Sequence, residues 1–128
     1  MIKAFLVGIS SEYEGEDIEV RYCIYEDEKL LSKKSIIMGY KKPAILGQVA
    51  LTILLKELEK YIGKEIVVMV NDAALYEIVR GTSTTKNKDV LKMARETREA
   101  LEKFENLSVK DVSGNYLELA KWNEVLRS

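Results

Sequence analysis

The chain has 128 residues, of which 47% are hydrophobic and 32% are charged. This balance is typical of a soluble globular protein, and we expect one domain over residues 1–128. The formal net charge of −1 does not indicate a nucleic-acid partner, although a local basic surface remains possible. No apolar run approaches the roughly 20 residues that span a bilayer, so we expect no membrane contact.

The chain has no histidine and a single cysteine, Cys23. The lack of histidine excludes histidine-based catalytic triads and histidine-ligated zinc sites. One cysteine cannot form a disulfide within the chain, which favours a reducing cytoplasm as the compartment. We interpret Cys23 as a packed strand residue and not as a nucleophile, because only Arg21 offers a cationic group close to it in the sequence.

The N-terminal third predicts three strands. Residues 2–9 are apolar on both faces, as a central strand would be. Residues 18–25 alternate between apolar and polar side chains, and residues 30–38 follow after a four-residue polar turn. Short connections between such runs indicate an antiparallel meander.

The remaining sequence alternates helices with strands. Pro43 suits the first position of a helix that runs to about Gly63. The pattern then predicts a strand, two helices, a strand and a last helix. Their predicted ranges are 65–70, 73–80, a helix ending near 104, 107–112, and a helix that starts after Asn115. For that last helix, Asn115 and Glu118 have the spacing of a capping box.

The predicted element order is β-β-β-α-β-α-α-β-α. A meander followed by strand–helix alternation predicts an α+β fold with a mixed five-stranded sheet flanked by helices.

This order resembles the ribonuclease H-like superfamily over almost the whole chain. Three stretches are similar to the family in detail. "GQVALTILLKELEKY" looks like its first long helix, "VNDAAL" stands where its fourth strand ends in an aspartate, and "VSGNYLELA" looks like a shortened final turn and helix. The resemblance implies the fold of that family and a role with nucleic acid.

Enzymes of that family use four carboxylates to hold two divalent metals at the scissile phosphodiester. Carried onto this sequence, the resemblance puts Gly8, Gln48 and Asn71 at the first three acidic positions, and Glu118 could supply the fourth. The first three lack the charge that binds a hard cation, so we expect a degenerate member without catalytic residues, metal or cofactor. Mg²⁺ or Mn²⁺ would be needed only by an atypical nuclease that uses Asp72, together with Glu118 and Asp111.

Each of these residues also has an ordinary structural interpretation. Asn71 or Asp72 suits the N-cap of the helix 73–80. Gln48 could be a polar residue on a half-buried helix, and Glu118 fits the capping box. The sequence leaves both interpretations open.

Basic residues gather in two segments, 33–42 and 80–98. From them we select eight candidate nucleic-acid-binding residues: Lys41, Lys42, Arg80, Thr84, Lys86, Lys88, Lys92 and Arg95. The hydroxyls and lysines suit contacts with phosphates, and Tyr40 and Tyr76 could stack on bases. The alternative is an ordinary solvated surface, because glutamates interleave with the basic residues of the second segment.

The leading hypothesis is therefore a catalytically inactive ribonuclease H-like domain that binds an RNA/DNA hybrid or structured RNA through its backbone. The alternative is a structural or assembly module with a homodimeric or other protein partner. The third predicted strand would lie at a sheet edge, where Lys33 and Lys34 discourage pairing with another strand.

Overall fold

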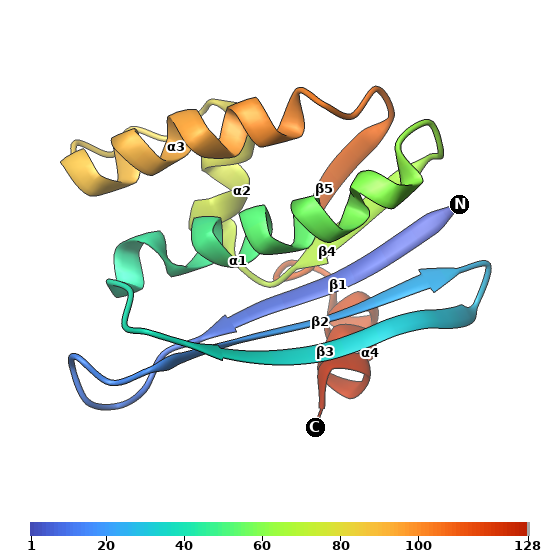
Figure 1. The fold of residues 1–128 in the computed structure, drawn as a ribbon, viewed down its shortest axis with the longest axis horizontal. Helices are drawn as coiled ribbons and strands as arrows, with labels where there is room; N and C mark the ends of the chain where they lie inside the picture. The colour runs from blue at the N-terminus through green and yellow to red at the C-terminus, as the bar shows by residue number, and fades with distance from the viewer. Residues whose placement is uncertain (128) are drawn as a thin grey trace.

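The computed structural model describes residues 1–127, which form one mixed five-stranded sheet with helices on both faces (Figure 1). The strands are β1 (Ile2–Ile9), β2 (Ile18–Glu26), β3 (Lys29–Met38), β4 (Ile66–Val70) and β5 (Leu107–Asp111). The helices are α1 (Pro43–Leu58), η1 (Glu59–Tyr61), α2 (Ala73–Arg80), α3 (Lys88–Leu101) and α4 (Tyr116–Leu126). The predicted element order is confirmed.

The sheet has the strand order β3-β2-β1-β4-β5. Strands β1, β2 and β3 form the predicted antiparallel meander, whereas β4 is parallel to β1 and β5 is parallel to β4. The carboxyl ends of β1, β4 and β5 therefore lie at one edge of the sheet. In mixed α/β sheets this edge is where ligand sites are usually built.

Alternation along β1 divides the core into two parts. Ile2, Ala4 and Leu6 face α1 and join the larger hydrophobic cluster, which includes α1 residues such as Leu51 and Leu54. Phe5 faces the opposite way and packs in a second cluster with Cys23, Met69, Val112, Trp122 and Leu126. Because both faces of β1 are largely buried, its sequence is apolar at every position except Lys3. Helices α1, α2 and α3 cover one face of the sheet, and α4 covers the other (Figure 1).

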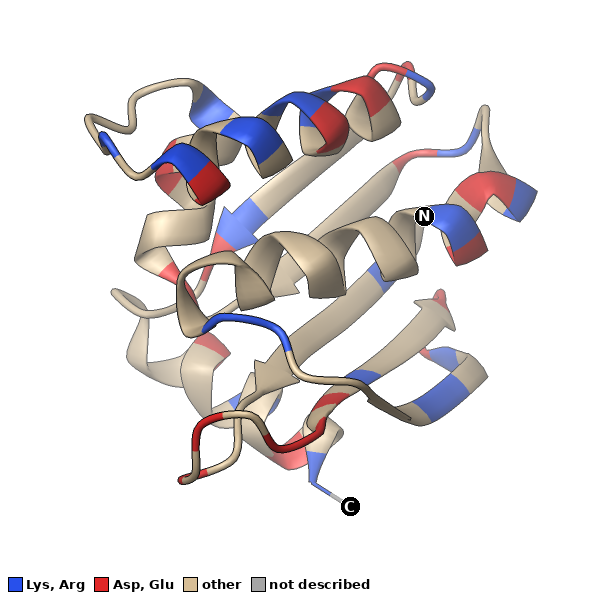
Figure 2. Ribbon diagram, turned by 60° about the vertical axis from the view of Figure 1, so that its left-hand side comes forward, with Lys and Arg blue, Asp and Glu red and all other residues tan. Residues whose placement is uncertain are grey.

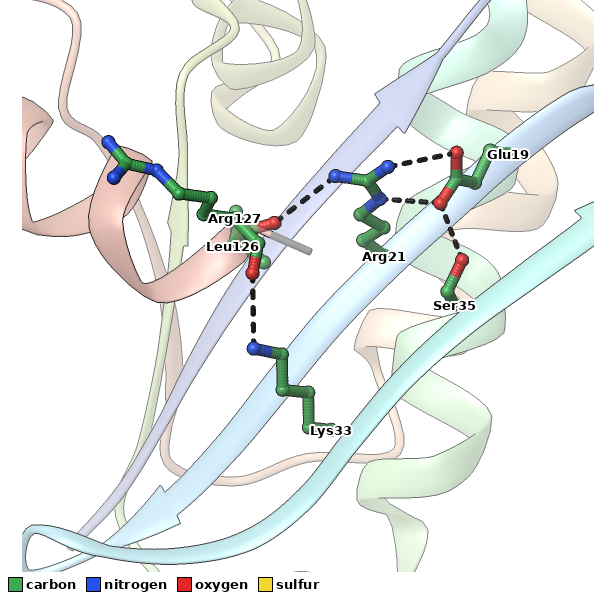
Figure 3. A network of polar contacts seen from close by, with 6 residues as sticks. All are labelled: Glu19, Arg21, Lys33, Ser35, Leu126 and Arg127. Atoms are coloured by element: carbon green, nitrogen blue, oxygen red, sulfur yellow. Dashed lines mark hydrogen bonds and ion pairs between the residues drawn. The ribbon is translucent and has the colours of Figure 1, made fainter.

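Helix α4 is hydrogen-bonded to the sheet in its middle and at its C-terminal end. The Trp122 indole N–H donates to the Leu6 carbonyl over 3.0 Å. At the C-terminal end, Arg21 donates to the Leu126 carbonyl and Lys33 donates to the Arg127 carbonyl, as Figure 3 shows. Cations next to the last carbonyls of a helix also interact favourably with its dipole.

Cys23 is buried, and its thiol donates to the Val125 carbonyl. Burial raises the pKa of this thiol, which disfavours the nucleophilic thiolate. The interpretation of Cys23 as a packed residue is confirmed.

Several predicted boundaries need correction. The first helix ends at Leu58 and continues as a short 3₁₀ turn, and the third helix ends at Leu101, before the predicted Phe104. The capping box of α4 is only half formed. Asn115 Oδ1 accepts from the Glu118 N–H as predicted, but the Asn115 N–H donates to the Val112 carbonyl. The Glu118 carboxylate pairs with Lys110.

Within residues 1–127, no helix has the length and apolar character needed to cross a lipid bilayer.

The turn between β2 and β3 predicts a stabilising substitution. Asp27 and Glu28 have φ values of 46° and 74°, the positive values that a two-residue hairpin turn of type I′ requires. Glu28→Gly should raise the free energy of unfolding by about 0.5–1 kcal/mol, because glycine adopts positive φ without a Cβ clash. Urea denaturation would measure the change. Glu28→Ala is the matched control, since it removes the same charge but keeps the Cβ. An equal gain from both variants would assign the effect to charge.

Candidate functional site

The carboxyl ends of β1 and β4 meet the first turns of α1 and α2 at a small cleft. Its volume is about 110 Å³, and its lining includes Gly8, Gly47, Asn71 and Asp72. Two of the four positions implied by the family resemblance, Gly8 and Asn71, are therefore brought together here. Asp72 is the only acid among the described residues that line the cleft.

Helix α1 turns Gly47, and not Gln48, toward Asp72. A Cβ built at Gly47 would lie 2.5 Å from Asp72 Oδ2, so the backbone of α1 passes directly beside that carboxylate. Gly8 is similarly crowded, because a Cβ there would lie 2.9 Å from the Leu46 side chain. Neither position has room for an acidic side chain without a shift of its neighbours.

The expectation that Gln48 stands at this cleft is wrong. Gln48 is only 1% exposed and points away from the cleft, toward α3. Its amide nitrogen donates to the Val90 carbonyl over 3.2 Å, and its Oε1 accepts from the Thr97 hydroxyl over 3.1 Å. Because both amide atoms have buried partners, Gln48 joins α1 to α3 as a tertiary hydrogen-bond bridge. Gln48 is thus a polar residue of α1, as the structural interpretation had it, but at a fully buried position of that helix.

Asp72 is the N-cap of α2, as one of the two interpretations predicted. Its Oδ1 accepts from the Leu75 N–H over 2.9 Å, and its own N–H donates to Asp111 Oδ1 over 3.2 Å. Asp111 in turn accepts from the N–H and the hydroxyl of Ser113. These bonds tie the end of β5 to the start of α2, and they use carboxylate oxygens that a metal site would need.

The residues present do not fit a two-metal centre. Among residues 1–127, no group of three or more aspartate, glutamate, cysteine or histidine side chains is placed to hold a metal ion. Glu118, the acid expected from the last helix, pairs with Lys110 instead. Asn71 and the two glycines are neutral, so Asp72 is the only lining residue with the negative charge that holds hard cations.

The capping role of Asp72 predicts the effects of two substitutions on stability. Asp72→Ala should lower the free energy of unfolding by about 0.5–2 kcal/mol, because the Leu75 N–H loses its acceptor. Asp72→Asn should have little effect, because asparagine caps helices nearly as well. Chemical denaturation of both variants would measure this. Equal destabilisation by both variants would mean that the charge of Asp72, and not its capping bond, matters.

The two basic segments meet beside the cleft. Lys42 Nζ lies 2.8 Å from Asp89 Oδ2, and this pair joins the start of α1 to the start of α3. The ion pair raises the pKa of Lys42 and lowers that of Asp89. Pro43, the neighbour of Lys42, lines the cleft. One surface therefore runs from the cleft past residues 41–42 to the N-terminal half of α3.

The charges along α3 are unevenly distributed. Val90, Ala94 and Thr97 face inward. The exposed charged side chains are Lys88, Asp89 and Lys92 in the first half of the helix, and Arg95, Glu96, Arg98 and Glu99 in the second half. Cations outnumber anions only in the first half. Figure 2 shows blue and red bands alternating along α3. The acidic residues Asp89, Glu96 and Glu99 therefore interleave with the cations along α3, so the alternative of an ordinary solvated surface stays open.

The other candidate binding residues are arranged differently. The Arg80 guanidinium lies over the Tyr76 ring, 5.2 Å from its centroid, on the last turn of α2. Thr84 and Lys86 are exposed in the segment between α2 and α3, and Lys41 is half-buried. Tyr76 is half-buried and already covered by Arg80, so it presents less free ring surface than expected.

The sequence did not single out Gly47, although its place four residues after Pro43 puts it at the end of the first helical turn.

The fold is similar to those of several solved ribonucleases H1. The enzyme from the halophilic archaeon Halobacterium salinarum matches with a TM-score of 0.78 and 16% identity, covering 91% of this chain and 89% of that one. LC11 ribonuclease H1 in complex with an RNA/DNA hybrid matches with a TM-score of 0.79 and 15% identity, covering 98% and 94%.

A third match is the N-terminal ribonuclease H domain of the Mycobacterium tuberculosis protein Rv2228c, with a TM-score of 0.74 and 15% identity, covering 87% of this chain and 86% of that one. No protein-family model matches the sequence, and no curated protein sequence matches it significantly. At these identities the likeness concerns the fold alone. The chain has the ribonuclease H-like fold.

Proposed function

We propose that this protein binds nucleic acid through phosphate contacts and does not cleave it. The observation that carries the proposal is the contact between Lys42 and Asp89, which joins two basic segments 47 positions apart in the sequence into one surface beside the cleft. A surface assembled from separate elements can contact several phosphates of one ligand, which a single basic segment could not do as well.

The position of this surface also supports the proposal. It adjoins the carboxyl ends of β1 and β4. LC11 ribonuclease H1, which has a similar fold, was solved in complex with an RNA/DNA hybrid. The N-terminal half of α3 adds exposed cations and the positive end of a 14-residue helix. Both features attract phosphate. An RNA/DNA hybrid or a structured RNA is the ligand class that we propose.

The proposed absence of cleavage rests on the cleft. Two-metal hydrolysis needs several carboxylates within reach of both ions. Here two glycines and an asparagine stand beside Asp72, and one oxygen of Asp72, Oδ1, already caps α2. A bound backbone would therefore pass the cleft without meeting a charged metal site.

Binding can be measured by titrating the protein with a labelled RNA/DNA hybrid, duplex RNA and duplex DNA at several salt concentrations. We expect binding that weakens steeply with salt, since each neutralised phosphate of a duplex adds about 0.9 to the slope of log affinity against log salt. The absence of binding to all three ligands at low salt would refute the proposal.

The same hybrid, incubated with Mg²⁺ or Mn²⁺, should stay intact. Cleavage that disappears in Asp72→Asn would instead support an atypical nuclease.

A further inference from the structure

The segment between α2 and α3 is held by its own side chains at regular intervals. The Thr85 N–H donates to the Ser83 hydroxyl over 3.3 Å, and the Asn87 N–H donates to the Thr85 hydroxyl over 3.2 Å. Asn87 Oδ1 then accepts from the N–H groups of Asp89 and Val90. Every second side chain from residue 83 to residue 87 therefore bonds the backbone two residues ahead.

Both ends of this segment are also fixed. Gly81 ends α2 in the left-handed conformation with φ of 76°, and the Thr82 hydroxyl donates to the Glu77 carboxylate over 2.6 Å. At the other end Asn87 is the N-cap of α3. A short polar segment of this kind would ordinarily be mobile, but here local hydrogen bonds restrict its backbone.

The alternation determines which side chains face outward. Ser83 and Thr85 are half-buried, whereas Thr84, Lys86 and Lys88 are exposed. Thr84 and Lys86 belong to the segment itself, and Lys88 is the first residue of α3. Among the described residues, neither Lys86 nor Lys88 forms an ion pair, so both ammonium groups are available to a ligand.

We infer that Ser83 and Thr85 are positioning residues that hold Thr84, Lys86 and Lys88 as a pre-formed row for successive phosphates of one nucleic-acid strand. This inference rests on the proposed function and adds the means by which the site is organised. A segment that is already ordered loses less conformational entropy on binding, and the difference appears as affinity.

The double variant Ser83→Ala/Thr85→Ala removes both holding hydroxyls but none of the outward side chains. Its affinity for the hybrid should fall about tenfold, because one or two backbone residues must then be ordered on binding. The slope of log affinity against log salt should stay unchanged, because the number of cations that meet phosphates is the same. The variant Ser83→Thr/Thr85→Ser, which keeps both hydroxyls, should bind like the wild type.

Ser10→Ala/Ser108→Ala is the matched control, because it removes two exposed hydroxyls outside the segment and should leave affinity unchanged. NMR order parameters for residues 83–87 of the free wild-type protein provide an independent measurement. Values typical of rigid backbone, about 0.85, are expected, with a decrease in the double-alanine variant.

Two results would overturn the inference while leaving the proposed function intact: wild-type affinity in the double-alanine variant, or order parameters below about 0.6 in the free wild type. If the wild type binds no nucleic acid although residues 83–87 are rigid, the proposed function itself has failed, and the phosphate-positioning role fails with it.

Discussion

Replacing Gln48 by glutamate should strongly destabilise the protein and should not create a metal site. The Gln48 amide donates to the Val90 carbonyl in an environment where Gln48 is 1% exposed and Thr97 is fully buried. A carboxylate cannot donate to that carbonyl, and it would place a negative charge in the interior. We expect Gln48→Glu to lower the free energy of unfolding at pH 7 by about 2–4 kcal/mol.

The destabilisation should depend on pH in a defined direction. Burial would raise the pKa of the introduced carboxyl above its unfolded value of about 4.3. The penalty should therefore be complete above the folded-state pKa and should shrink as pH falls toward the unfolded value, where the carboxyl is protonated in both states. Urea denaturation of Gln48→Glu and wild type at pH 7 and at about pH 4.5 would measure this difference.

Gln48→Met is the matched control, because it has a similar length and loses the hydrogen bonds without adding charge. It should destabilise by about 1–2 kcal/mol with no such dependence on pH. A rise in stability of Gln48→Glu on addition of Mg²⁺ would contradict the bridging role. It would mean that residue 48 can turn toward Asp72.

Reversing three positive charges of α3 should remove most of the nucleic-acid affinity. Lys88→Glu/Lys92→Glu/Arg95→Glu converts three exposed cations into anions, on the surface that adjoins residues 41–42. We expect affinity for the hybrid to fall at least about a hundredfold at moderate salt, and the salt slope to fall by about 2–3. Fluorescence anisotropy at several salt concentrations would measure both quantities.

A control with the same change in net charge separates a local effect from a general one. Lys29→Glu/Lys56→Glu/Lys121→Glu places the reversals on the β2–β3 turn, the last turn of α1 and α4. It should retain most of the affinity. The α3 variant should remain folded, because acidic residues near a helix N-terminus interact favourably with the helix dipole. Equal losses in both triple variants would show that binding follows net charge and uses no particular surface.

Local signals in the sequence predicted most of the secondary structure. Pro43 marks the start of α1. Proline has no backbone N–H, and the first turn of a helix does not use that group. Asp72 and Asn115 are N-caps because short polar side chains bond N–H groups within their own turn. Helix α3 was also predicted, because helical spacing is visible within a single segment. These features depend on residues only a few positions apart.

Long-range contacts decided the parts that were predicted wrongly or only as open alternatives. A one-residue shift along a helix rotates a side chain by about 100°, so similarity of sequence could not decide whether residue 47 or 48 faces the cleft. The close approach of α1 to Asp72 at Gly47 decides it. Likewise, the predicted capping box paired the Glu118 carboxylate with the Asn115 N–H, but in the structure this carboxylate pairs with Lys110 on β5.

The sequence by itself determined the element order, the helix caps and the lack of histidine chemistry, because each follows from composition or from neighbours within a few residues. The tertiary structure alone decided that Gln48 bridges α1 and α3, that Gly47 meets Asp72, and that Lys42 and Asp89 join two basic segments. The reason is physical. Each of these contacts joins elements separated by 25 or more positions, and only the packing of α1 against the sheet and α3 brings them together.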